Sequence, residues 1–237
     1  MKRLLMMGAV LALAACSPSG EGDKKEEAAT PAPATQPAAT PAPVAPVATD
    51  VPAGTYRLDK THATLHFRVS HLGFSNYTAA FTDFDAELQL DPKNPEASSV
   101  TARVNPKSLS LPAPPKGFVD ELLGKGWLNA AEFPEITFKS TKVELTGADT
   151  ARITGDFSLH GVTAPLTLEA KFNGGYIGHE YDPNARIGFS AKGSLKRSAH
   201  GVSYGIPAPG TTMGVSDDVE VIIEAEFSGP PMPAAPK

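Results

Sequence analysis

Apolar and polar residues alternate along most of the chain after residue 54. In the run Leu65-His66-Phe67-Arg68-Val69, for example, every second side chain is apolar. A period of two residues is typical of a β-strand that buries one face and exposes the other. The pattern predicts eight strands, at residues 65–69, 84–90, 100–104, 136–145, 153–159, 166–172, 187–195 and 219–227.

Two local departures from this alternation predict specific features. The apolar phase of the fourth strand shifts by one residue near Ser140 without a turn, which indicates a β-bulge. Before that strand, apolar residues recur at helical spacing from Phe118 to Leu128. Asp120 and Glu121 would lie in the first turn, where the helix dipole favours acids. A short helical insertion is therefore expected, broken at Gly124.

The segments between the predicted strands are rich in turn-forming residues. Most contain Gly, Asn or Pro, as in Asn173-Gly174-Gly175, so the strands are expected to run mostly antiparallel. Eight such strands can close into a barrel or stack as a sandwich. A transmembrane barrel is disfavoured, because its lumen would be too narrow for the charged faces of the strands. The pattern predicts an all-β fold and favours an eight-stranded antiparallel barrel with an apolar interior.

Composition separates the first 53 residues from the rest. A basic start followed by a short apolar run predicts a signal peptide at residues 1–15. Residues 16–53 are rich in Pro and Ala and contain no Leu, Ile, Phe, Tyr or Trp, so a disordered linker is expected there. A single domain is predicted at residues 54–228, followed by a disordered tail at residues 229–237.

The only cysteine of the chain stands at the predicted cleavage point. Leu13-Ala14-Ala15-Cys16 resembles the lipobox of bacterial lipoproteins. The resemblance implies cleavage before Cys16 and acylation of that residue, which would tether the protein to a membrane in the periplasm. Ser17, where some lipoproteins have aspartate, favours the outer membrane over the inner one. An ordinary signal peptide with an incidental cysteine is the alternative.

Charge and chemistry exclude several classes of protein. The net charge is −5 and the predicted domain has no basic run, which argues against nucleic-acid binding. One cysteine rules out disulfides within the chain, cysteine-based zinc sites and iron–sulfur clusters. His62 and His66 would share a strand face, but lie about 13 Å apart at ~3.3 Å per residue, too far to bind one metal ion. No catalytic residue and no cofactor are predicted.

Five segments of the predicted domain, taken in order, resemble the YceI-like lipid-binding family. They cover essentially the whole domain, and their order makes the match specific. One departure is Ala199-His200-Gly201, where family members usually have an acidic residue, an aromatic residue and Gly after Arg-Ser. The matching segments are residues 58–74, 81–92, 132–140, 153–166 and the stretch from 187 to 198.

The resemblance implies a lipocalin-like barrel with an elongated apolar cavity. The implied ligand is a polyisoprenoid, a quinone-type lipid or another long-chain amphiphile, held for storage or transport. Self-association into a homodimer is left open. The residues expected to line the cavity are Leu65, Phe67, Val69, His71, Phe81, Phe84, Leu88, Phe138, Phe157, Leu168, Phe189 and Ala191.

Two other functions remain open at this point. Phenylalanines on the inward strand faces could fill the core completely, which would leave a structural or interaction lipoprotein without a ligand. An enzyme acting on the bound lipid would need two polar groups that converge inside, and only His71 has the right phase. Small inward residues could instead leave a tunnel, namely Ala86, Ala102, Gly155, Ala170, Ala191 and Gly193.

Overall fold

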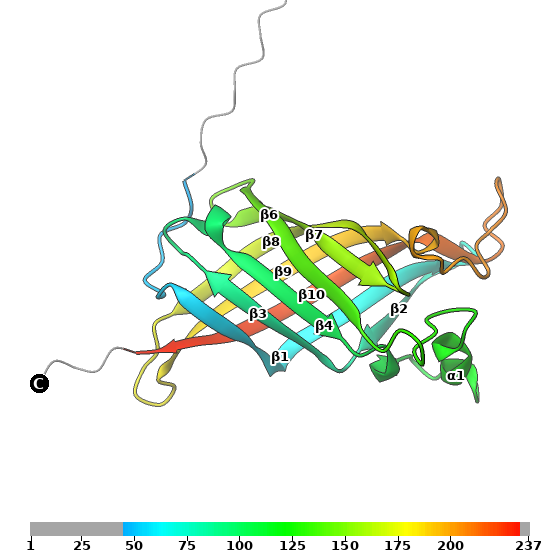
Figure 1. Cartoon of the computed structure of the whole chain (residues 1–237), viewed down its shortest axis with the longest axis horizontal. Coiled ribbons are helices and arrows are strands. Elements are labelled where there is room, and N and C mark those ends of the chain that lie inside the picture. The colour runs from blue at the N-terminus through cyan, green and yellow to red at the C-terminus, as the bar shows by residue number, and fades with distance from the viewer. Residues whose placement is uncertain (1–44, 233–237) are drawn as a thin grey trace, which may run out of the picture. The chain divides into compact units, whose positions relative to one another are not determined.

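A computed structural model describes residues 45–232 as strands and one short α-helix joined by turns (Figure 1). Cys16, the predicted signal peptide and most of the predicted linker lie outside the described residues. The strands are β1 (Gly54–His71), β2 (Ser75–Phe81), β3 (Phe84–Leu90), β4 (Ser99–Val104), β5 (Leu109–Ser110), β6 (Ile136–Leu145), β7 (Thr150–Leu159), β8 (Val162–Tyr176), β9 (Asn184–Lys196) and β10 (Val215–Pro231).

Eight of these strands form the closed antiparallel barrel that the alternation predicts. Each pairs with the next in the order β1, β3, β4, β6, β7, β8, β9 and β10, and β10 then pairs with β1. Closure removes the two edges that an open sheet would expose. The barrel prediction is confirmed, and the sandwich alternative is excluded.

The sequence pattern does not predict β2 and β5. On one side, β1 pairs with β3 through Gly54–Arg57 and with β2 through Leu65–His71, so that β2 continues the wall beyond β3. The two residues of β5 pair with the end of β2. Two adjacent small residues, Ala79 and Ala80, interrupt the alternation in β2, which is why its pattern does not read as a strand.

The loops divide between two ends of the barrel. The linker end is where residues 45–53 enter, and it also carries the loops 91–98, 146–149 and 177–183. The helix end carries the β1–β2 hairpin, the long connection with α1, the β7–β8 turn and the loop from Arg197 to Gly214. In Figure 1 the helix end lies at the right and the linker end at the left.

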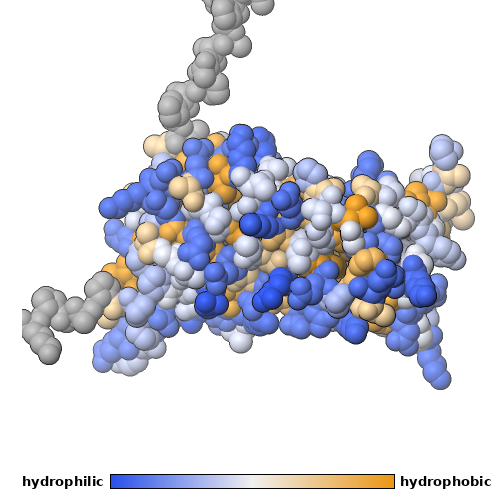
Figure 2. Space-filling view, in the orientation of Figure 1, coloured by the Kyte–Doolittle hydropathy of each residue, from blue (hydrophilic) through white to orange (hydrophobic). Residues whose placement is uncertain are grey.

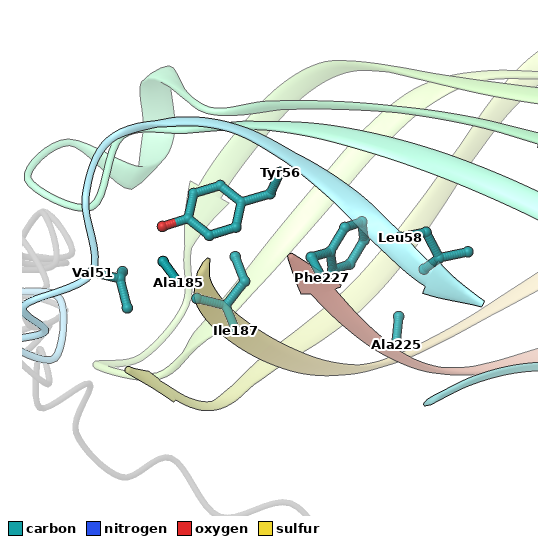
Figure 3. Close-up of a cluster of buried hydrophobic side chains, with 7 residues drawn as sticks. All are labelled: Val51, Tyr56, Leu58, Ala185, Ile187, Ala225 and Phe227. Atoms are coloured by element: carbon teal, nitrogen blue, oxygen red, sulfur yellow. The ribbon is translucent and has the colours of Figure 1, made fainter. Parts of the chain in front are cut away.

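A buried cluster lies at the linker end (Figure 3). Tyr56 is fully buried in it, and its hydroxyl donates a 2.7 Å hydrogen bond to the carbonyl of Pro52. Burial raises the pKa of Tyr56 to about 12. Val51, Ile187 and Phe227 pack in the same cluster, so that the chain start and the last strand are joined here.

The ordered part of the chain extends beyond the predicted domain at both ends. Val51 is only 4% exposed, although the sequence places it in the disordered linker, and the backbone N–H of Val47 donates to the carbonyl of Ala148. At the other terminus β10 continues to Pro231, beyond the predicted limit at residue 228. Composition misses these residues because single valines and prolines at a barrel end carry no alternation.

The strand register shifts at five places in the barrel wall, including one in β6 near Ser140 and one in the first half of β1. The predicted bulge is confirmed, because the β6–β7 register shifts between Ser140 and Lys142. The Ser140 hydroxyl accepts a 2.9 Å hydrogen bond from the backbone N–H of Val100. A second bulge lies in β1, where four residues between Leu58 and Ala63 face a single residue of β10. The strand alternation does not indicate this second bulge.

The predicted helical insertion is confirmed as α1, Phe118–Leu123, which ends at Gly124. The segment that follows α1 forms turns instead of a second helical piece. Within residues 45–232, no helix is long and apolar enough to cross a membrane. Short 3-10 turns lie at Pro95–Ala97, Pro106–Ser108 and Arg197–His200.

Gly155 in β7 is expected to be intolerant of any side chain. An added Cβ would lie 2.5 Å from the carbonyl oxygen of Lys139 and 2.5 Å from the ring of Phe138. We expect Gly155→Ala to lower the free energy of unfolding by about 1–3 kcal/mol, as overpacking does in other cores. Chemical denaturation would measure the change.

Gly188 in β9 provides the matched control. A Cβ added there meets nothing closer than 3.9 Å. Gly188→Ala should leave stability unchanged or raise it by up to ~1 kcal/mol, because it restricts the unfolded chain. Equal losses in the two variants would contradict the close approach at Gly155.

Candidate functional site

The barrel lumen holds a cavity of about 920 Å³. This volume is near the upper limit of the range of roughly 300–1,000 Å³ that small-molecule sites occupy. The lining runs from Pro46 and Val51 at the linker end to Phe118 and Trp127 at the helix end. The structural alternative requires a core that side chains fill completely. The interior of the barrel is not filled in this way.

The structure places every predicted cavity residue in this lining. Most come from β1, β3, β6, β7, β8 and β9, which bring inward-facing positions far apart in sequence around one lumen. Their contact with a ligand stays a prediction. The lining includes Leu65, Phe67, Val69, His71, Phe81, Phe84, Leu88, Phe138, Phe157, Leu168, Phe189 and Ala191.

Aromatic rings form much of the wall. Phe67 and Phe81 have ring centroids 5.4 Å apart, and Phe172 and Phe189 have centroids 5.5 Å apart, within the range of favourable aromatic pairs. Phe227 lies edge-on to Phe189 at 6.2 Å. Such pairs hold the rings against the wall and leave the centre of the lumen open.

The small inward-facing residues fall into two groups, those that line the cavity and those that a neighbouring side chain covers. Four alanines line the cavity, among them Ala102 and Ala191, and so leave the space that the sequence predicts. The two glycines do not, because the ring of Phe138 covers Gly155 and the side chain of Leu168 covers Gly193. Alternation predicts which face a residue occupies but not which neighbour fills the place of a missing side chain.

The polar residues of the lining include a group at the helix end. Arg197 is 5% exposed, and its guanidinium donates hydrogen bonds of 2.8–2.9 Å to four backbone carbonyls, those of Val202, Tyr204, Val215 and Ser216. Burial lowers the pKa of Arg197 from its ordinary value. Arg197 therefore joins the loop that follows it to the start of β10.

Two aromatic side chains complete this end of the cavity. The guanidinium of Arg197 lies 5.3 Å from the ring centre of Trp127, which in turn stacks edge-on against Tyr204 at 5.3 Å. Sequence reasoning missed Trp127 and Tyr204 because both lie in loops without alternation. Three further lining residues, Pro112, Pro114 and Pro115, belong to the Pro-rich stretch of the domain.

An acidic residue of another strand contacts the segment next to the sequence departure at residues 199–201. Asp217 of β10 accepts hydrogen bonds from the backbone N–H and the hydroxyl of Ser198, at 2.9 and 2.8 Å. These bonds and the ammonium of Lys196 lower the pKa of Asp217, although burial opposes the shift.

The arrangement of polar groups does not resemble a catalytic site. His71 and Glu121 line the cavity, yet no hydrogen bond joins them to each other or to Arg197 within the described residues. The run from Gly201 to Gly205 has the Gly-x-Ser-x-Gly spacing of a nucleophile elbow, which the sequence reasoning overlooked. It lies in a loop and not between a strand and a helix, and no histidine or acid hydrogen-bonds the hydroxyl of Ser203 among the described residues.

A second polar cluster lies at the β1 bulge, outside the cavity lining. Asp59 accepts hydrogen bonds from the hydroxyl and the backbone N–H of Thr61, from His62 and from the guanidinium of Arg186. Thr61 and His62 make the largest contributions that hold the pKa of Asp59 far below its usual range. Asp59 and Glu226 raise the pKa of His62.

This cluster contains the one group among the described residues that is compact enough for a metal ion, formed by Asp59, His62 and Glu226. Arg186 already provides a cation against Asp59, and His62 and Glu226 are more than half exposed. The group therefore reads as an ion-pair network that stabilises the bulge. His66 and His71 do not join it.

The closed antiparallel barrel and its long lumen define the chain as a β-barrel protein with an internal apolar cavity. Such barrels share a fold without sharing a ligand. The chain belongs to the YceI-like domain family, which matches residues 56–227.

Relatives in this family include UPF0312 proteins of two bacteria. The protein of Yersinia pestis is 36% identical over 177 residues, which cover 73% of this chain and 86% of the relative. The protein of Enterobacter sp. is 37% identical over 179 residues, with the same coverage of both chains.

Solved structures with the same fold come from several bacteria. Burkholderia cenocepacia BcnA has a TM-score of 0.61 at 21% identity, covering 71% of this chain and 98% of its own. A YCEI protein of Campylobacter jejuni has a TM-score of 0.56 at 25% identity, covering 68% and 90%. A polyisoprenoid binding domain from Saccharophagus degradans has a TM-score of 0.54 at 13% identity, covering 76% and 100%.

Replacing the buried arginine is expected to loosen the helix end. Arg197→Lys keeps the charge but cannot reach four carbonyls, because an ammonium has three donors and no planar fork. We expect the free energy of unfolding to fall by at least ~2 kcal/mol, since buried acceptors lose charged donors. Hydrogen exchange in the loop from residue 201 to 214 should accelerate.

Arg152 on the barrel surface is the control for this substitution. It pairs with Glu169 at 3.0 Å, and its side chain is 48% exposed. Arg152→Lys should change stability by less than ~0.5 kcal/mol, because exposed ion pairs contribute little. If the two variants lose the same stability, Arg197 does not fasten the loop.

Proposed function

We propose that the protein is a periplasmic lipoprotein that holds a polyisoprenoid or another long-chain amphiphile in its barrel lumen, for storage or transport. The observation that carries the proposal is the length and apolar character of one cavity that extends from the linker end to the helix end. A prenyl chain has no polar group except at one terminus, so it needs apolar length and few polar partners. The lumen offers both.

The hydrophobic effect supplies the binding energy in this proposal. Transfer of apolar surface from water is worth roughly 25 cal/mol per Å². A long prenyl chain inside the barrel contacts phenylalanine rings and aliphatic side chains over most of its length. The protein would thus keep in a water-filled compartment a lipid that water alone cannot dissolve.

The family gives independent support to this ligand class. The fold is shared with a domain from Saccharophagus degradans that is described as polyisoprenoid binding. This chain belongs to the YceI-like domain family, and the resemblance to that family implies a lipid ligand. A quinone-type head group is one form that the ligand could take.

The tether is the second part of the proposal. Cys16 lies outside the described residues, so its acylation rests on the lipobox-like sequence alone. An acyl chain on Cys16 would keep the carrier near the membrane that holds its lipid. The outer membrane is favoured by Ser17.

Native ligand occupancy tests the carrier. Extraction of the natively purified full chain should yield a prenyl lipid by mass spectrometry, and the emptied protein should take up a prenyl quinone from detergent. Ala191→Trp, which places a large ring in the lumen about halfway along β9, should weaken uptake by more than about tenfold, or ~1.4 kcal/mol. Lys192→Trp places the same ring on the outer face of the same strand and should leave uptake unchanged.

A protein that is repeatedly empty and takes up no prenyl lipid would contradict the carrier. Equal uptake by the Ala191→Trp and Lys192→Trp variants would instead contradict the lumen as the binding site. Thermal unfolding of both variants shows whether the barrel is intact.

The tether has its own test. Radiolabelled palmitate should label the wild-type chain, and the protein should fractionate with membranes. When residues 1–15 are replaced by a signal peptide that is cleaved without acylation, Cys16→Ser should abolish the label and move the protein to the soluble periplasmic fraction. Retention of the Cys16→Ser protein in the membrane fraction with the label lost would show that acylation is not the anchor.

A further inference from the structure

The two ends of the barrel differ in the charge of their loops. At the linker end, the loops 91–98, 146–149 and 177–183 together carry five acidic residues and one lysine. At the helix end, residues 71–79, 108–115 and 201–215 carry no Asp, Glu, Lys or Arg. Charges of the long connection at this end are confined to Lys107 and the stretch 116–135. Three segments at the helix end, residues 71–79, 108–115 and 201–215, are thus uncharged.

These uncharged loops expose large apolar side chains. Phe74 at the tip of the β1–β2 hairpin is 82% exposed, and Met213 in the long loop is 66% exposed. In Figure 2 the loop that projects beyond the barrel at the right carries mostly pale and orange residues. Neither residue lines the cavity. Tyr204, in the same loop as Met213, is 62% exposed. Exposed apolar side chains that gather in adjoining loops can mark an interaction surface.

Phe74 and Met213 belong to one surface because their loops touch. The backbone N–H of Leu72 donates a 2.8 Å hydrogen bond to the carbonyl of Gly214, and a Cβ at Gly73 would lie 3.0 Å from Thr212. Leu72 and Gly73 both have positive φ, 55° and 71°, which turns the chain back at this tip.

The same loops border the cavity. Leu72 lines it, and so do Tyr204 and Gly205 of the loop that carries Met213. The exposed apolar tips therefore flank the end of the lumen and are contiguous with its lining. A lipid that leaves a bilayer at this end would remain against apolar surface and avoid crossing water.

We propose that the helix end docks on a lipid bilayer, with Phe74 and Met213 inserted at the interface and the lumen facing the lipids. The proposal rests on the proposed function, because the ligand must come from a membrane. Insertion at an interface is driven by buried apolar area, and the missing charges at these tips remove the cost of carrying ions into it. We call these two side chains and their loops the docking rim.

The tether is compatible with this orientation. Residues 17–44 separate Cys16 from the first described residue at the linker end, and they could reach about 100 Å at ~3.5 Å per residue. β10, the strand that runs the length of the barrel wall, has 17 residues, or about 56 Å at ~3.3 Å per residue. The anchor at one end therefore does not prevent the opposite end from reaching the same membrane.

Vesicle flotation of the mature chain, residues 16–237, with Cys16→Ser tests the docking rim, because this protein has neither the acyl anchor nor the apolar run of residues 4–15. This protein should float with vesicles of phosphatidylcholine alone, and high salt should not release it, because no ionic contact is involved. Adding Phe74→Ser and Met213→Ser should reduce flotation by at least about tenfold.

Tyr181 provides the matched control. It is 88% exposed at the linker end, between Glu180 and Asp182. Tyr181→Ser in the same Cys16→Ser background should float like the parent. Equal flotation of the docking-rim variant and the parent would overturn the proposal, and so would release of the parent by salt. Sedimentation that shows a dimer lost only in the docking-rim variant would assign the surface to self-association instead.

Lipid uptake separates this proposal from the carrier function. The docking-rim variant should take up a prenyl quinone from detergent like the parent, but more slowly from vesicles, by about tenfold. Failure of the parent to take up the quinone from any source would contradict the carrier, whereas flotation would still decide on docking. Uptake from vesicles at parental rates would overturn docking and leave the carrier intact.

Discussion

Hydrogen bonding between the first strand and the last holds this molecule together. β1 pairs with β10 from Arg57 to His71, and this pairing turns a sheet of neighbours in sequence into a closed wall. Every other strand pair of the barrel joins strands that follow one another along the chain, apart from β2 between β1 and β3 and the long connection with β5 and α1 between β4 and β6. The lumen, its volume and the inward direction of each side chain all depend on that one long-range contact.

The β1–β10 pairing also contains a bulge that is stabilised by a polar network of its own. Four residues of β1 bulge opposite β10, and Asp59 in that bulge is held by Thr61, His62 and Arg186. The low pKa of Asp59 reflects this network and keeps the carboxylate ionised. A polar cluster that resembles a metal site in composition therefore stabilises the seam of the barrel, while the lumen behind it stays apolar.

Period-two alternation was sufficient to predict the eight barrel strands, the bulge at Ser140 and the inward face of each strand, whereas the expectation of an open cavity came from the family resemblance. In a barrel with one apolar face per strand, the phase of each residue determines whether it points inward. The helix end was largely beyond prediction. Arg197, Trp127 and Tyr204 meet there through loops, and a loop has no period that relates one residue to another. The burial of Val51 was not predicted for the same reason.

The position of Trp127 gives the protein a property that is useful for following it. It is the only tryptophan of the chain, and it lies between the guanidinium of Arg197 and the ring of Tyr204 at one end of the lumen. The near-ultraviolet fluorescence of this protein therefore originates largely from one indole ring at the helix end of the lumen. Its colour and intensity report on that end of the barrel without any added label.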